Sequence, residues 1–493
     1  MSERNLAKNT VYYSAALAFQ KALSFVFFII LARNLGVAGQ GRFTFALSFT
    51  ALFAIFLDLG LSQILIRETA RDKNKTEEYL ASVIGFKLAA ALFLYAIIII
   101  AVNLMGYPDA TQNLVYVSGF VMLIDSLTLN IYSVIRGNHN LGYESVGAIG
   151  NQLIVLILGG ALLLLQANPV LVMSVYVISS LANLIWSAFN LRRVFKMKIG
   201  IAFDWTLIKI LLGLSLPFAV AGIFSRIFAS TDIVLLSKIS GDHAVGIYSA
   251  AFKVAFALQF VALAFSASLY PAFSAYWAHS KENLSKLFTK SMFWLIFIAG
   301  PMVFGVIAIA DPAIPKVFGQ AYAASVLPLQ ILMASMLFVF ICFPLGALLN
   351  ACDRQKRHTI NLGVTALTSI ILNLILIPFF SYSGAAVANL LSYIVLFSLD
   401  IVVVSNIIDY DKKFLLWSSF KILISCIIMF AATWLVKSYA GFIIAIIAGI
   451  ITYIILAYAF RIFSFKSVKE FMKSVKKKPQ DVEYIEEENI SQK

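Results

Sequence analysis

The chain has 493 residues, of which 61% are hydrophobic and only 13% are charged, and its formal net charge is +14. This composition excludes a soluble globular protein, because apolar runs of about 20 residues, each long enough to cross a bilayer as a helix, recur along the whole length. The alternating ten-residue segments of a membrane β-barrel do not occur. The sequence therefore predicts an all-α integral membrane protein.

In chain order, the apolar runs predict fourteen membrane-spanning helices. The expected ranges are 9–32, 41–66, 79–104, 113–135, 145–165, 169–190, 206–235, 243–270, 286–309, 322–349, 358–380, 384–408, 414–436 and 440–462. The first run carries Lys21 and is too long for the core of a cleavable signal peptide, so we expect it to remain as the first span. A basic and then acidic tail follows the last span, and its basic part is expected on the anionic inner leaflet.

The basic residues predict the orientation, because cytoplasmic loops of membrane proteins are enriched in Lys and Arg. With the N-terminus inside, most of the 38 basic residues fall on cytoplasmic segments and the tail. The predicted external loops hold only Arg33, Arg42, Lys238, Lys316 and Lys437. We therefore expect a multi-pass protein of the cell membrane with both termini in the cytoplasm. The same distribution explains the positive charge without a nucleic-acid partner.

One stretch near the N-terminus, Leu31–Phe45, returns 205 positions later as Leu236–Ala250. The two copies read LARNLGVAGQGRFTF and LSKISGDHAVGIYSA, and in this register Gly41 meets Gly246. Both copies join an outward-running span to its returning span, so the two halves have the same topology and an axis along the membrane normal relates them. We expect an N-terminal bundle at 1–200, a C-terminal bundle at 201–410, two extra spans at 411–464 and a cytoplasmic tail at 465–493.

Charged side chains inside the predicted spans are the strongest functional signal. Such a group costs roughly 2.5–3.5 kcal/mol at the bilayer centre on insertion scales, and it normally faces a cavity or a partner. The residues concerned are Lys21, Asp58, Lys87, Asp125, Arg226, Asp232, Lys253 and Asp400. The first, second, seventh and eighth spans each carry one polar stripe on an apolar helix, as helices that line water do. Because the first two spans are the repeat partners of the seventh and eighth, we expect one shared cavity.

The candidate substrate-binding residues are Lys21, Arg226, Lys253, Asp58 and Asp232. The repeat register places Lys21 on Arg226, and three cations in a cavity of low dielectric constant favour an anionic group such as phosphate. The alternative is that these charges neutralise each other, for example Arg226 with Asp232 or Lys253 with Asp58. Outside the repeated pairs, Lys87 and Asp125 are interpreted as partners of one another.

No motif indicates covalent chemistry. A Walker A motif is absent, and Cys342, Cys352 and Cys426 show no metal or disulfide spacing. The four histidines fall in or near loops without partners at ligand spacing. We therefore expect no catalytic residue, no metal site and no cofactor, and a transporter rather than an enzyme.

Several motifs, taken in order, resemble those of the polysaccharide-biosynthesis flippases of the Wzx type, in the multidrug/oligosaccharidyl-lipid/polysaccharide exporter superfamily. They are LARNLGVAGQGRF, LDLGLSQILIRETA (Leu57–Ala70), TDIVLLSKISGDHAVGIYSAAFKV (Thr231–Val254), SLYPAFSAY (Ser268–Tyr276), LLNACDRQK and LNLILIPFFSYSGAAVANLLS. The resemblance implies two six-helix bundles around a central cavity lined by the same four spans. It also implies alternating access, which moves a polyprenyl-pyrophosphate oligosaccharide from the cytoplasmic to the outer leaflet for surface polysaccharide or glycan synthesis, with cavity cations holding the pyrophosphate.

Two other functions stay open. An ion-coupled exporter of small amphipathic drugs would need a carboxylate site, for which Asp58 or Asp125 is suited. A membrane glycan polymerase or ligase is less favoured, because the predicted external loops are too short to carry a carboxylate pair for glycosyl transfer. Besides the lipid-linked substrate and membrane lipids, glycan-assembly enzymes and a coupling ion are open as partners.

Overall fold

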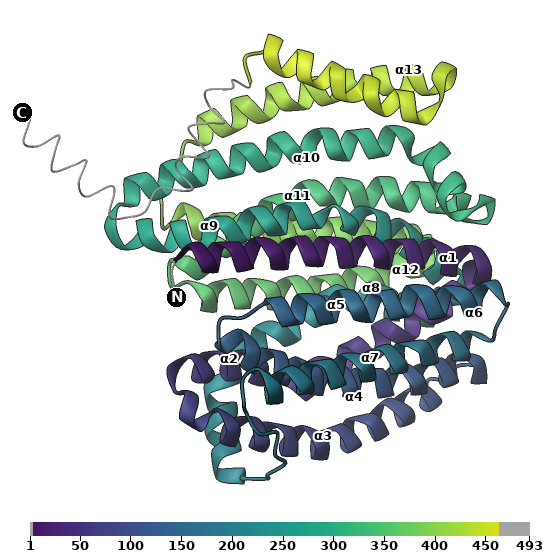
Figure 1. Cartoon of the computed structure of the whole chain (residues 1–493). Helices are drawn as coiled ribbons and strands as arrows, with labels where there is room; N and C mark the ends of the chain where they lie inside the picture. The colour runs from purple at the N-terminus through teal and green to yellow at the C-terminus, as the bar shows by residue number, and fades with distance from the viewer. Residues whose placement is uncertain (1–2, 463–493) are drawn as a thin grey trace, which may run out of the picture. The chain divides into compact units, whose positions relative to one another are not determined.

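The computed structural model describes residues 3–462, with side chains at Tyr13 and from residue 15 onward. Within this range the chain consists of helices joined by short turns, and no residue forms a strand (Figure 1). The predicted all-α class is confirmed. The expected cytoplasmic tail at 465–493 lies outside the described residues.

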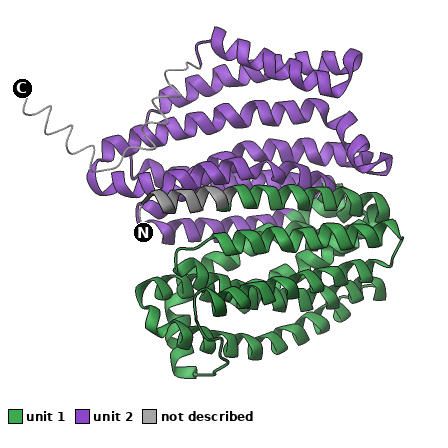
Figure 2. Cartoon of the chain, in the orientation of Figure 1, with its two compact units in different colours: residues 1–249, 373–382 green, residues 250–372, 383–493 purple. Residues whose placement is uncertain are grey.

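The chain divides into two compact units (Figure 2). The first comprises Met1–Ser249 and Asn373–Tyr382. Its elements are α1 (Glu3–Asp58), α2 (Leu61–Arg71), the 3-10 turn η1 (Lys73–Lys75), α3 (Thr76–Leu104), α4 (Asp109–Gly137), α5 (Gly142–Ile154), the π-helical turn η2 (Val155–Gly159), α6 (Gly160–Leu164), α7 (Pro169–Arg193) and most of α8 (Trp205–Ala257). Aromatic and aliphatic side chains such as Phe43, Phe45 and Ile98 fill its core and are almost completely buried.

The second unit comprises Ala250–Leu372 and Ser383–Lys493. Its elements are the end of α8, α9 (Gln259–His279), α10 (Lys281–Phe318), the 3-10 helix η3 (Gln320–Ser325), α11 (Val326–Ala351), most of α12 (Gln355–Ser405) and α13 (Lys412–Ala459). Leu284, Phe288 and Leu345 are fully buried in its core.

Four of the long helices are interrupted by one residue with positive φ: Gly36 in α1, Gly241 in α8, Ser381 in α12 and Gly441 in α13. The interruptions at Gly36, Gly241 and Ser381 fall between two predicted spans, whereas Gly441 is the second residue of the predicted span 440–462. Gly36 and Gly241 hold the same position in the repeat. Among the described residues, ten segments are long and apolar enough to cross a membrane, and four of them contain such an interruption. The chain is thus a multi-pass membrane protein, whereas the exact number of fourteen crossings stays a prediction.

The predicted span 41–66 is not one continuous helix. Helix α1 ends at Asp58, and α2 begins at Leu61 after Gly60, whose φ is +74°. A Cβ at Gly60 would lie 3.0 Å from the backbone oxygen of Ser215 on α8. Glycine therefore permits both the left-handed turn and the close approach of α8.

Candidate functional site

A cavity of about 270 Å³ lies within the first unit and contains charged side chains from three helices. The lining residues are Leu47, Thr50, Ala51, Ala54 and Asp58 of α1, Ser118, Val121, Met122, Asp125, Ser126 and Leu129 of α4, and Arg226 of α8. Two of the five candidate site residues, Asp58 and Arg226, thus line the same cavity. Lys21, Lys253 and Asp232 are not among its lining residues.

Asp58 is already engaged by a buried lysine. The Lys87 Nζ donates to Asp58 Oδ1 at 2.8 Å and to Asn130 Oδ1 at 2.8 Å, and Ser62 donates to Asp58 Oδ2 at 2.8 Å. The Lys87 side chain is completely buried. The predicted pairing of Lys87 with Asp125 is therefore wrong, because α3 presents the lysine to the end of α1 instead. The negative charge of Asp58 is compensated on the side away from the cavity.

Arg226 has a different environment from Asp58. Its side chain lies on an exposed part of α8 and lines the cavity. It forms no ion pair or hydrogen bond with any residue that the structure describes, so the suggested pair with Asp232 is not formed. An arginine presents five donors in a planar fork that matches phosphate oxygens, and here they face open space.

The other three candidate residues occupy separate places. Lys21 is exposed on α1 and makes no hydrogen bond or ion pair with the side chains that the structure describes. Lys253 is half-buried near the end of α8. Asp232 is buried and accepts hydrogen bonds from Tyr248 at 2.7 Å and from Asn373 at 2.8 Å. Both of these donors, Tyr248 and Asn373, belong to the first unit.

The polar groups of α4 were not among the predicted site residues. Asp125 is exposed in the cavity and is hydrogen-bonded by Ser180 of α7. The Ser126 hydroxyl, which lines the cavity, and the Asn130 Nδ2 are buried without a hydrogen-bond partner among the described residues. Ser118 and Asp125 lie seven residues apart and so share one face of α4, and this spacing could have indicated the cavity wall.

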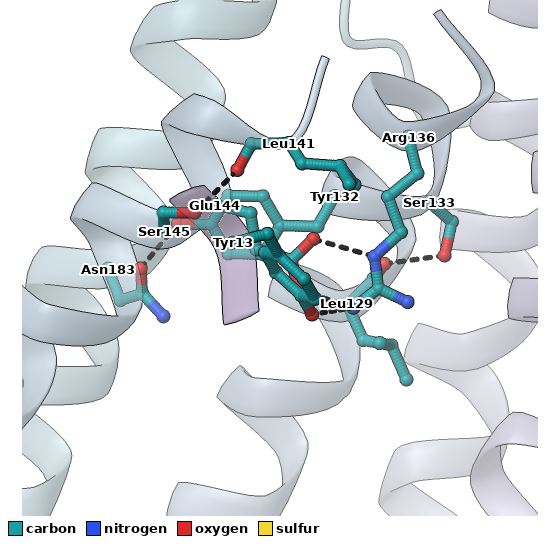
Figure 3. A network of polar contacts seen from close by, with 9 residues as sticks. All are labelled: Tyr13, Leu129, Tyr132, Ser133, Arg136, Leu141, Glu144, Ser145 and Asn183. Carbon is teal, nitrogen blue, oxygen red and sulfur yellow. Dashed lines mark hydrogen bonds and ion pairs between the residues drawn. The ribbon is translucent and has the colours of Figure 1, made fainter. Parts of the chain in front are cut away.

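A second polar network joins α1 to the turn between α4 and α5 (Figure 3). Arg136 contacts both carboxylate oxygens of Glu144, with Nε 2.6 Å from Oε2. The Tyr13 hydroxyl donates to Glu144 Oε1 at 3.2 Å, and nearby Tyr132 donates to Asn183 at 2.6 Å. This network fixes the first turns of α1 against the rest of the first unit.

The two copies of the repeated stretch bring α1 and α8 into close backbone contact within the first unit. A Cβ placed on Gly41 would lie 1.9 Å from the Asp242 backbone oxygen, so only glycine allows this approach. Gln40 is fully buried and donates through Nε2 to Thr44 at 2.8 Å and to Ser249 at 2.9 Å. The Arg42 Nε lies 3.1 Å from an Asp242 carboxylate oxygen. These contacts join the predicted span 41–66 to the predicted span 243–270.

The fold is that of MurJ and MATE transporters. A solved structure of the lipid II flippase MurJ, in an inward closed conformation, superposes with a TM-score of 0.77 at 17% identity, and the match covers 91% of this chain and 98% of that one. An inward-facing MATE family transporter of the MOP superfamily gives a TM-score of 0.62 at 15% identity, over 78% of this chain and 95% of its own.

The chain belongs to the polysaccharide biosynthesis protein family, whose model matches residues 6–277. The MatE family model matches residues 217–378. A relative from Haloferax volcanii, named probable low-salt glycan biosynthesis flippase Agl15, is 24% identical over 412 residues, which are 79% of this chain and 82% of the relative. The capsular polysaccharide biosynthesis protein CapF of Staphylococcus aureus is 22% identical over 397 residues, which are 79% of this chain and 97% of CapF.

Proposed function

We propose that the chain is a flippase that moves a polyprenyl-pyrophosphate-linked oligosaccharide from the cytoplasmic to the outer leaflet, without covalent chemistry. The observation that carries this proposal is the charge balance of the cavity in the first unit. Lys87 compensates Asp58, and Arg226, the one cation among the residues that line this cavity, forms no ion pair with any described residue. The Asp125 carboxylate lines the same cavity from α4. Arg226 is therefore the group that an anionic substrate would contact there.

The names of the relatives support the chemical class of the substrate. The Haloferax volcanii relative is named as a glycan biosynthesis flippase and the Rhizobium meliloti relative, ExoT, as a succinoglycan biosynthesis transport protein. In our proposal Arg226, with Lys21 and Lys253, binds the pyrophosphate in one of the alternating conformations. The sugar crosses through the polar cavity, the polyprenyl tail stays in lipid, and two bundles at 1–200 and 201–410 move to change access. Both termini face the cytoplasm.

The test is leaflet exchange of a defined polyprenyl-pyrophosphate oligosaccharide by purified protein in vesicles. Arg226→Gln is expected to slow exchange at least tenfold, since a charge-assisted contact is worth about 1.5–3 kcal/mol. Arg226→Lys keeps the charge but loses the planar fork, so its rate should be intermediate. Lys290→Gln, at an exposed position on α10, is the control for a lost positive charge. Unchanged exchange by Arg226→Gln would overturn the assignment of Arg226.

The exposed carboxylate of Asp125 favours a second candidate function, the export of small cationic drugs coupled to an ion. In that case Asp125→Asn would abolish drug resistance of cells and leave surface glycan unchanged. Loss of surface glycan with unchanged drug sensitivity would instead support the flippase.

A further inference from the structure

A second cavity, of about 380 Å³, lies at the segment between α7 and α8. Its lining residues are Arg192, Lys196, Met197, Lys198 and Ile199, none of which lines the cavity that contains Arg226. Three of the five carry a positive charge. The segment lies outside the apolar spans Pro169–Arg193 and Trp205–His279, so it belongs to the membrane surface rather than to its interior.

Alternating side chains give this segment an apolar side and a cationic side. Phe195, Met197 and Ile199 are half-buried and pack against the core around Leu80 and Ile208. The intervening residues, Lys196 and Lys198, are exposed. Burial of the three apolar residues anchors the segment, and the two lysines between them are left facing outward.

Backbone contacts with α3 hold the segment in place. The Ala202 N–H donates to the Ala81 carbonyl at 3.1 Å, and the Lys198 N–H donates to Glu77 Oε1 at 2.8 Å. A Cβ on Gly85 would lie only 2.0 Å from the Ala202 backbone oxygen, so the glycine permits this close packing. The backbone that carries the lysines is consequently ordered before any ligand binds, which removes that part of the entropic cost of binding.

The positive charge of this cavity is not compensated by the protein. The side chains of Arg192, Lys196 and Lys198 form no ion pair or hydrogen bond with any described residue. The Glu77 carboxylate accepts from the backbone N–H of Lys198, not from its side chain. An arginine and two lysines around one cavity match a phosphate group in charge and in hydrogen-bond donors.

Exposed apolar side chains beside the cations identify the source of the phosphate. Ile201, Phe203 and Trp205 follow directly and are 72%, 59% and 49% exposed. The Phe203 and Trp205 rings stack at 6.3 Å, and Lys209 Nζ lies 5.5 Å from the Trp205 ring. Tryptophan and basic residues gather where membranes meet water, and basic pockets there bind anionic lipid headgroups. We propose that Arg192, Lys196 and Lys198 bind the headgroup of an anionic phospholipid, while Ile201 and Phe203 contact its acyl chains.

This proposal rests on the proposed cytoplasmic location of the segment, but not on flipping. The test is binding of phosphatidylglycerol by the full-length protein in nanodiscs of phosphatidylcholine, measured by native mass spectrometry. Each basic residue near an anionic surface contributes about a fivefold factor. The triple variant Arg192→Gln/Lys196→Gln/Lys198→Gln is therefore expected to bind phosphatidylglycerol roughly a hundredfold more weakly. Leaflet exchange is measured separately. Loss of exchange therefore tests the flippase proposal, and loss of phosphatidylglycerol binding tests the lipid site.

The matched control is Arg71→Gln/Lys73→Gln/Lys75→Gln, which removes the same charge from an exposed turn before α3. This control should bind phosphatidylglycerol within threefold of the wild type. Should the triple variant not fold, Lys196→Gln and Lys198→Gln singly should each weaken binding about fivefold. Unchanged binding by the triple variant would overturn the proposal, as would an equal loss in the control. Inorganic phosphate binding as tightly as phosphatidylglycerol would assign the site to a soluble anion instead.

Discussion

Gly41 and Gly246 hold the same position in the two copies of the repeat, and each contacts the other's helix. A Cβ on Gly41 would lie 1.9 Å from the backbone oxygen of Asp242, and a Cβ on Gly246 would lie 2.0 Å from that of Val37. Val37 and Asp242 are themselves separated by the repeat offset of 205 residues. The two copies of the repeat therefore pack backbone against backbone in a locally twofold arrangement. This contact holds the ends of their helices together near the predicted external turns.

Gly41→Ala and Gly246→Ala are expected to force these helices apart. Overpacking typically costs about 1–3 kcal/mol, and here the added methyl group meets backbone that cannot rotate away. We expect a lower melting temperature in detergent and faster labelling of external cysteine reporters near the turns. Gly213→Ala is the matched control, because no atom lies within 4 Å of a Cβ at that position of α8. A melting temperature of Gly41→Ala equal to that of Gly213→Ala would contradict the prediction.

The contact between Gln40 and Ser249 allows the same helix ends to be cross-linked reversibly. Gln40 Nε2 lies 2.9 Å from Ser249 Oγ, and cysteine is two atoms shorter than glutamine. A short bifunctional methanethiosulfonate reagent, rather than a direct disulfide, should therefore join the two thiols of Gln40→Cys/Ser249→Cys. If the helix ends must separate during transport, this cross-link should slow leaflet exchange at least tenfold, and a reductant should restore it. The single variants are controls.

The native cysteines should not interfere with this experiment. All three are buried, and burial raises the pKa of the Cys352 thiol to about 11, so the reactive thiolate is scarce at pH 7. Full exchange by the cross-linked double variant would show that this contact persists throughout the transport cycle.

The all-helical fold and the turns of the repeat could be predicted from the sequence. Apolar length identifies a span, and a short interruption such as that around Gly36 identifies a turn, because both are local properties of the chain. The break at Gly60 could not be predicted in the same way. Its left-handed conformation follows from the approach of Ser215, which is distant in the sequence.

The candidate site was predicted only in part, for a related reason. Helical spacing shows which residues share a face, and Asp58 and Arg226, which it placed on polar stripes, both line the cavity of the first unit. It does not show toward which neighbour that face turns. The partner of Lys87 therefore depends on the rotation of α3 against α1, which only the packing of the first unit determines. The substrate contacts of Lys21 and Lys253 stay predictions.

The network in Figure 3 should be a main source of stability at the start of α1. Glu144→Gln removes a carboxylate that accepts from both Arg136 and Tyr13, so we expect a loss of about 2 kcal/mol in the free energy of unfolding. Tyr13→Phe deletes one hydrogen bond of the same network and should cost about 1 kcal/mol. Unfolding in mixed micelles measures both. Equal stability of Glu144→Gln and the wild type would indicate that water replaces these contacts.

The buried pair of Lys87 and Asp58 predicts an effect that a double variant can isolate. Lys87→Met leaves the Asp58 carboxylate without its cation and should lower the free energy of unfolding by about 3–5 kcal/mol, the usual cost of breaking a buried pair. Adding Asp58→Asn removes the unpaired charge, so Lys87→Met/Asp58→Asn should recover most of that loss. Unfolding of the wild type, Lys87→Met, Asp58→Asn and the double variant in mixed micelles gives the coupling energy. If the losses in unfolding free energy from the two substitutions simply add, Lys87 does not stabilise the Asp58 carboxylate. Water or another cation would then compensate Asp58.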